Sequence, residues 1–180
     1  MDQDAHGAFA GRRMNCLVKI TSSLLGAIRT DLRRPHAFAH ERVGFIGCGL
    51  AAAHDRLLIL AQAYEPVADE DYLPDPRVGA MISGEAIRRA RQWAMDSRLS
   101  IFHVHTHGGR GVPGFSGVDI RENAKFVPNF VSVAPHAVHG ALVLSDDAAF
   151  GQVWRGRQSP EIFITRFVEV GLPLRTWSAS

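Results

Sequence analysis

Histidines occupy every second position near the middle of the chain, at His103, His105 and His107. Successive side chains of a β-strand point to opposite faces, so these three imidazoles would leave the same face. Two imidazoles at positions i and i+2 near a strand end can bind one divalent ion at about 2.0–2.1 Å each. The spacing therefore predicts a metal site at the end of a strand.

A glycine-rich segment, residues 108–115, follows the histidines and lets the chain turn back toward them. It leads to Ser116 and Asp119 at the start of an expected helix, where Asp119 can supply a third, oxygen ligand. Two imidazoles and one carboxylate leave a coordination position open, which is typical of a catalytic rather than a structural zinc. Such an ion lowers the pKa of its bound water to about 7 and polarises a substrate carbonyl.

Hydrolysis at such an ion also needs a carboxylate that takes the proton from the water and passes it to the leaving amine. Glu41, which opens an apolar glycine-rich strand, is the candidate for this general acid/base. Glu65 and Glu85 are weaker candidates, because Glu65 begins an acidic loop and Glu85 suits the first turn of a helix.

Each of these residues also has a purely structural interpretation. The histidines could be hydrogen-bonded residues of the core, and Ser116 and Asp119 have the spacing of a helix cap with an acidic first turn. Both interpretations of Asp119 can hold, since a first-turn carboxylate can also point at a metal. His103 is expected to pack in the sheet or to orient a ligand. Solvated or loop positions are expected for four further histidines: His40, His54, His136 and His139.

The order of expected elements places this chemistry on a mixed sheet. Strands are expected at 16–20, 42–50, 56–64, 100–105, 141–144, 150–154 and 162–168, and helices at 21–33, 83–98 and 116–129. The second and third strands would form a hairpin through His54 and Asp55, followed by an exposed acidic loop. The pattern predicts an α/β fold of the α+β type: a single domain with a central mixed, mostly antiparallel sheet flanked by helices.

Composition excludes several classes of protein. The chain has 180 residues, 46% of them apolar and 21% charged, which suits one domain with a sizeable core. A net charge of +2 is too small for a nucleic-acid or polybasic membrane signature. The longest apolar runs fall short of the ~20 residues that span a bilayer, and the N-terminus lacks a secretory pattern. Cys16 and Cys48 are expected to be buried free thiols, which favours a cytoplasmic protein.

The pattern Glu41…His105-Thr-His107…Ser116-x-x-Asp119 resembles the signature of the JAMM/MPN (Mov34/PAD-1, prokaryotic JAB) zinc metalloprotease family. The resemblance implies a cytidine-deaminase-like JAB/MPN architecture over residues 15–172. Residues 1–14, which are polar and rich in glycine and alanine, are expected to form a flexible N-terminus, and residues 173–180 a C-terminal tail. This chain has eight residues between His107 and Ser116 where the family usually has seven, and Cys48 where the family tends to have a second glycine.

The resemblance also implies roles for the residues. His105, His107 and Asp119 would bind Zn²⁺, Glu41 would be the general acid/base, and Ser116 would stabilise the oxyanion. The implied activity is that of an isopeptidase acting after the C-terminal glycine of a ubiquitin-like protein in a bacterial pathway. The implied partners are that protein or its conjugate, with activating and conjugating enzymes as further candidates, and neither nucleic acid nor membrane.

Other functions remain open at this stage. The enzyme could instead trim a sulfur-carrier protein or cut a small peptide, and a non-catalytic MPN scaffold is a third alternative. A cupin-like metal barrel ranks low, because no Glu follows the histidine pair closely and the helix at 83–98 fits a barrel poorly. The acidic run at 68–75 is expected to be a solvated loop, or else to receive a basic surface of the modifier.

Overall fold

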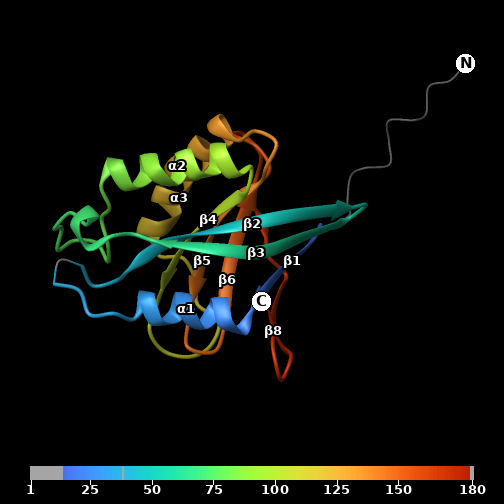
Figure 1. The fold of residues 1–180 in the computed structure, drawn as a ribbon, viewed down its shortest axis with the longest axis horizontal. Coiled ribbons are helices and arrows are strands. Elements are labelled where there is room, and N and C mark those ends of the chain that lie inside the picture. Colours follow the sequence, from blue (N-terminus) through green and yellow to red (C-terminus); the bar gives the residue numbers. More distant parts are fainter. Residues whose placement is uncertain (1–13, 38, 179–180) are drawn as a thin grey trace, which may run out of the picture.

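The computed structural model describes residues 14–37 and 39–178, and within them the chain forms three α-helices and one nine-stranded sheet (Figure 1). The helices are α1 (Ser22–Leu32), α2 (Gly84–Ser97) and α3 (Gly117–Val133), and a short 3-10 helix, η1, covers Asp69–Asp71. The strands are β1 (Asn15–Thr21), β2 (Val43–Ala53), β3 (Arg56–Pro66), β4 (Ser100–Thr106), β5 (His139–Leu144), β6 (Ala149–Trp154), β7 (Ile162–Phe163), β8 (Arg166–Val170) and β9 (Arg175–Ser178).

The strands are ordered β7-β6-β5-β4-β2-β3-β1-β8-β9 in the sheet. The pairs β1–β3, β1–β8 and β4–β5 are parallel, and the other neighbouring pairs are antiparallel. The predicted mixed, mostly antiparallel sheet with flanking helices is therefore confirmed.

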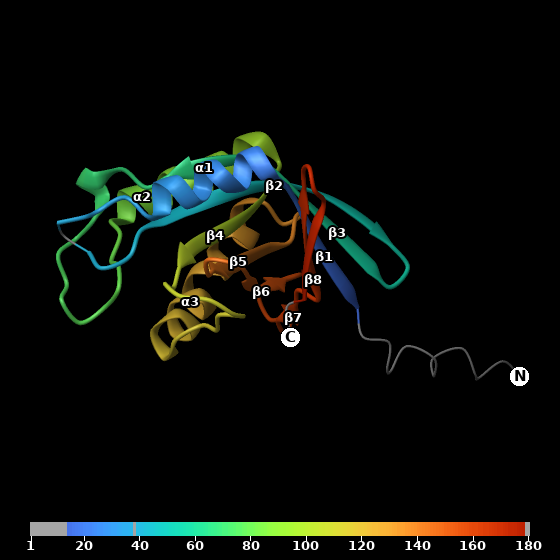
Figure 2. The ribbon, with the colours of Figure 1, turned by 90° about the horizontal axis from the view of Figure 1, so that it is seen from below.

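The sheet curls, so that strands far apart in its order lie side by side (Figure 2). The N–H of Ile164 donates to the carbonyl of Gly151 in β6 at 3.0 Å, whereas the N–H of the next residue, Thr165, donates to Cys16 in β1 at 2.8 Å. The expected single strand at 162–168 is therefore wrong. It divides into β7 and β8 because the side chain of Ile164 is buried in the core between them.

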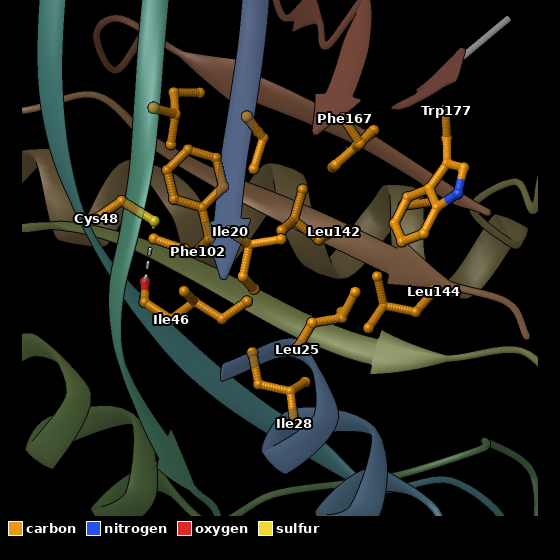
Figure 3. A pocket seen from close by; sticks show the side chains of 14 residues that line it. Ile20, Leu25, Ile28, Ile46, Cys48, Phe102, Leu142, Leu144, Phe167 and Trp177 are labelled. Atoms are coloured by element: carbon orange, nitrogen blue, oxygen red, sulfur yellow. Dashed lines mark hydrogen bonds between the residues drawn. The ribbon is translucent and has the colours of Figure 1, made fainter. Parts of the chain in front are cut away.

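Helices cover the two faces of the sheet separately, with α1 on one face and α2 and α3 on the other (Figure 1). Side chains of β4 alternate between these layers: Phe102 and Val104 join the α1 core, whereas Ile101 joins the α2 core. The alternation places His103 and His105 on the face toward α3. The α1 core encloses a small apolar cavity of about 20 Å³, which is too small for a ligand larger than a water molecule. Figure 3 shows the side chains that line it.

Strands β2 and β3 form the expected hairpin, and His54 in its turn adopts a positive φ of 51°. The register between β2 and β3 shifts between Gly47 and Cys48. Near the start of β2, the ring of Tyr64 occupies the space that a Cβ at Gly44 would need. Glycine at the third position after Glu41 thus leaves room for the Tyr64 ring of β3.

Side-chain caps begin the helices where the sequence predicts them. Thr21 Oγ1 accepts the N–H of Leu24 at 3.2 Å, and Ser83 Oγ accepts the N–H of Ala86 at 3.1 Å. The last helix, α3, runs past Pro128 to Val133 and is longer than expected. Its last turns are retained because Phe130 and Val131 are buried against the rest of the fold.

The C-terminal boundary differs from the expected one. The flexible N-terminus expected at 1–14 lies outside the described residues, except for Met14, which packs against the core. The expected tail at 173–180 contains β9, which pairs with β8, so the folded part extends beyond residue 172. Cys16 and Cys48 are free and buried, as expected, and burial raises the pKa of the Cys16 thiol to about 12. Among the helices at 14–37 and 39–178, none has the length and apolar character needed to cross a bilayer.

Candidate metal centre

The two imidazoles of His105 and His107 lie where β4 ends in the middle of the sheet. His105 is paired with Val43 of β2 on one side and with Val143 of β5 on the other. The N–H of His107 donates to the carbonyl of Leu144 at 2.9 Å, which continues the pairing past the strand. The Nε2 atoms of His105 and His107 are 3.2 Å apart. The i, i+2 spacing therefore brings both rings to one point.

Asp119 reaches the same point from the first turn of α3. Its Oδ1 lies 3.5 Å from Nε2 of His105, and its Oδ2 lies 3.5 Å from Nε2 of His107. The N–H of Ser116 donates to Asp119 Oδ2 at 2.7 Å, and the N–H of Asp119 donates to Ser116 Oγ at 3.2 Å. These reciprocal bonds form a capping box, so the capping interpretation is confirmed. The same cap holds the carboxylate beside the imidazoles.

The surroundings of Asp119 favour its ionised form. Burial alone would raise the pKa of this carboxyl. The interactions with His105 and the hydrogen bonds with Ser116 lower the pKa by more than burial raises it. The net effect holds the pKa of Asp119 well below its usual range. The group is therefore a carboxylate at neutral pH, which is the form that binds a cation.

The glycine-rich loop between His107 and Ser116 is fixed to the chain that follows β5. Gly109 and Gly111 have φ angles of 93° and 88°, which favour glycine. The N–H of Gly111 donates to Asp147 Oδ1 at 2.7 Å, and Ser145 Oγ donates to the Gly111 carbonyl at 2.7 Å. The eight-residue spacer is thus a defined turn that returns the chain to the histidines.

The donor atoms of this cluster fit a divalent ion. Ligand distances of about 2.0–2.1 Å in a tetrahedral site place neighbouring ligand atoms about 3.3–3.4 Å apart. Nε2 of His105 and Nε2 of His107 are 3.2 Å apart, and each lies 3.5 Å from a different oxygen of Asp119, His105 from Oδ1 and His107 from Oδ2. Imidazole and carboxylate groups are also common ligands of divalent transition metals.

Glu41 joins the cluster from the segment before β2. Its Oε1 lies 3.8 Å from Nε2 of His107, and donor atoms of Glu41, His105 and His107 all lie within 4.8 Å of one another. Asp119 approaches each imidazole at 3.5 Å, whereas Glu41 approaches Nε2 of His107 at 3.8 Å. The structure thus brings two carboxylates to the imidazole pair, Asp119 beside both rings and Glu41 beside His107.

The cluster opens to solvent on one side. The exposed fraction of the side chain rises from 2% at His105 to 17% at Asp119, 27% at His107 and 30% at Glu41. Solvent therefore reaches the cluster mainly at His107 and Glu41.

Two other histidines have structural roles. The ring of His103 packs between Phe45 and Phe126, with centroid distances of 5.8 and 5.5 Å, as its packing interpretation predicts. His139, expected in a solvated or loop position, is instead fully buried in β5. Its Nδ1 accepts the N–H of Ile101 at 3.1 Å, so the expectation for His139 is wrong.

The acidic run does not present all its carboxylates to solvent. Asp69 accepts a hydrogen bond from the buried guanidinium of Arg42 at 2.6 Å, and Asp71 is itself buried and pairs with Arg89. These carboxylates therefore bind arginines of the same chain. The sequence analysis did not single out Arg42, because its partner Asp69 lies beyond the whole β2–β3 hairpin.

Comparisons with known proteins leave the family open. No protein-family model and no curated protein matches the chain. Among solved structures, the N-terminal domain of STIL from Trichoplax adhaerens matches with a TM-score of 0.37 and 14% identity, over 76% of this chain and 41% of that one. The chain thus spans about two fifths of the length of that structure. Likeness at this level carries no argument about family or activity.

Proposed function

We propose that the chain is a zinc-dependent isopeptidase of the JAMM/MPN type, which cleaves after the C-terminal glycine of a ubiquitin-like protein in a bacterial cytoplasm. The observation that carries this proposal is the convergence of His105, His107 and Asp119 at 3.2–3.5 Å, with Glu41 3.8 Å from His107. The mixed, curled sheet, with a helix before the histidine strand, supports a JAB/MPN architecture as part of the same proposal.

Three side chains would hold the ion: His105 and His107 through Nε2, and Asp119 through its carboxylate. When bound, Zn²⁺ supplies an electrophile that lowers the pKa of a water molecule and polarises the scissile carbonyl. Glu41 would take the proton from the attacking water and pass it to the leaving amine. Its partly exposed carboxylate beside His107 suits a group that meets both water and substrate.

Ser116 would stabilise the oxyanion of the tetrahedral intermediate. Its Oγ accepts the N–H of Asp119, and a hydroxyl that accepts a hydrogen bond still has its own proton to donate. The cap therefore leaves the donor that the oxyanion needs. The capping and catalytic roles of Ser116 are compatible in this geometry.

The same residues would serve the closely related reaction of trimming a ubiquitin-like or sulfur-carrier precursor to its terminal glycine. The two reactions differ in the leaving group, which is a lysine side chain in a conjugate and a peptide amine in a precursor. Parallel assays with an isopeptide-linked and a peptide-linked substrate would separate them. A non-catalytic scaffold is less well supported, because scaffold members of the family usually lack the ligand set.

Metal analysis and a cleavage assay test the proposal together. We expect about one zinc per chain and cleavage of a ubiquitin-like protein that carries a fluorescent lysine on its C-terminal glycine. A chelator should abolish cleavage, and added zinc should restore it. Glu41→Gln should retain zinc but lose about 10²–10⁴-fold in kcat, the range typical of a general acid/base.

Glu65→Gln is the matched control, because Glu65 is an exposed acid at the end of β3 and lies outside the cluster. This variant should keep full activity. Cleavage without metal, or undiminished cleavage by Glu41→Gln, would contradict the mechanism. Stoichiometric zinc without cleavage of either substrate would favour the scaffold alternative.

A further inference from the structure

The backbone of Glu41 is held by a segment other than its own strand. Glu41 precedes β2, which begins at Val43. The N–H groups of His40 and Glu41 both donate to the carbonyl of Gly79, at 2.8 and 2.9 Å. Gly79 therefore fixes the position at which the Glu41 side chain leaves the backbone.

The side chain of Glu41 occupies the space that a side chain at Gly79 would need. A Cβ built on Gly79 would overlap Glu41 Oε2 and lie 2.5 Å from Cδ and 3.0 Å from Oε1. All three of its nearest heavy atoms belong to this one carboxyl group. Real Cβ atoms do not approach other atoms so closely, so any side chain at this position would displace the carboxylate.

The segment that contains Gly79 is itself anchored beside Glu41. We call residues 67–82 the supporting loop. Arg42 donates to Asp69 of this loop at 2.6 Å, and the hydroxyl of Tyr72 accepts the N–H of Val43 at 2.8 Å. The loop is thus bound to both residues that follow Glu41, and it is a fixed support.

We propose that Gly79 is a positioning residue for Glu41: its carbonyl holds the backbone, and its missing side chain leaves room for the carboxylate beside His107. This inference rests on the proposed function for its catalytic consequence. The steric relation between the two residues does not depend on catalysis and can be measured separately.

A thermal double-mutant cycle measures that relation. Gly79→Ala should lower the melting temperature of the wild-type chain only slightly, because the Glu41 carboxyl is the end of a flexible side chain and can move away from the methyl group. The same substitution should have still less effect in a Glu41→Ala chain, which lacks the atoms that the methyl group would meet. Gly84→Ala is the matched control, since a Cβ at Gly84 has no heavy atom within 4 Å, and it should show no coupling to Glu41.

A kinetic series measures the catalytic consequence. Gly79→Ala should lower kcat by about 10–100-fold, part of the loss expected when the general base is removed, and Gly79→Val should lower it further. Zinc content and KM should stay near wild type, because the three ligands are untouched. Gly84→Ala should keep full kcat.

The positioning role would be overturned if Gly79→Ala lowered the melting temperature equally in the wild-type and Glu41→Ala chains, or if Gly79→Ala kept full kcat. If the wild type binds zinc but cleaves nothing, the proposed function fails. The thermal cycle then still decides whether Gly79 holds Glu41, so the two failures are distinguishable.

Discussion

Nε2 of His107 lies 3.5 Å from Oδ2 of Asp119, and this same oxygen accepts the N–H of Ser116 at 2.7 Å. One carboxylate therefore both caps α3 and faces the histidines. The N-terminus of a helix stabilises a negative charge in its first turn, so the cap favours the ionised form that a cation needs. Local helix chemistry and the proposed metal site depend on the same side chain.

Asp119→Asn separates these two roles. The amide oxygen of asparagine can still accept the N–H of Ser116, so the helix cap should survive. The anionic ligand is lost, so zinc affinity should fall by more than the roughly 10–100-fold that is typical when a residue hydrogen-bonded to a metal ligand is replaced. Competition with a chelating dye measures the affinity, and Glu122→Gln on the exposed face of α3 is the control. Wild-type affinity in Asp119→Asn would remove Asp119 from the ligand set.

Substitutions of Ser116 distinguish its cap from its proposed oxyanion contact. Ser116→Ala should cost about 1 kcal/mol of stability, whereas Ser116→Gly should cost only a few tenths, because glycine is tolerated at an N-cap. Both variants lose the hydroxyl, so both should lose about 10²–10³-fold in kcat. Denaturant unfolding and steady-state kinetics give the two quantities. If kcat instead falls in proportion to stability, so that Ser116→Gly is nearly as active as wild type, Ser116 only caps the helix and does not contact the oxyanion.

The elements around the site could be predicted from the sequence because their signals are local. Alternation places His105 and His107 on one face of a strand, and the Ser116–Asp119 spacing marks a helix start. Glu41 could be named as a candidate from its place before a glycine-rich strand and from the resemblance, but nothing in its own neighbourhood indicates that it approaches the histidines.

The missed features depend on contacts between distant segments. Gly79 stands in a loop where glycine is common, and only the folded chain shows that Glu41 fills its space. Likewise, 162–168 has the composition of one strand, but the curled sheet divides it between β6 and β1. The buried state of His139 follows from its pairing in β5, which its sequence neighbours did not indicate.

Buried His139 should make the fold sensitive to acid. Burial lowers its pKa from 6.5 to about 4, and its ring is neutral, with Nδ1 accepting the N–H of Ile101. Between these pH values the unfolded chain binds a proton that the folded chain does not. The contribution of neutral His139 to the free energy of unfolding is therefore fully present above about pH 6.5 and is lost as the pH falls toward 4.

The lowered pKa of His139 corresponds to a loss of about 3 kcal/mol in the free energy of unfolding as the pH falls from 6.5 to about 4. Denaturant unfolding at several pH values should show a shallower acid slope in His139→Gln than in wild type, and no change in slope for exposed His136→Gln. An NMR titration of the wild-type ring gives the same answer without a substitution. A His139 pKa near 6.5 in the folded chain would contradict the prediction.

Tyr72→Phe tests whether the supporting loop stabilises the start of β2. The Tyr72 hydroxyl accepts the N–H of Val43 at 2.8 Å and donates to its carbonyl at 3.3 Å, both within the buried part of the fold. Phenylalanine keeps the ring but leaves these two polar groups without that partner, which should cost about 1–3 kcal/mol in urea unfolding. Glu70→Gln, on an exposed neighbour in the same loop, should leave the unfolding midpoint unchanged. Equal midpoints for Tyr72→Phe and wild type would show that this contact contributes nothing, and the anchoring of the loop would then rest on Arg42 and Asp69.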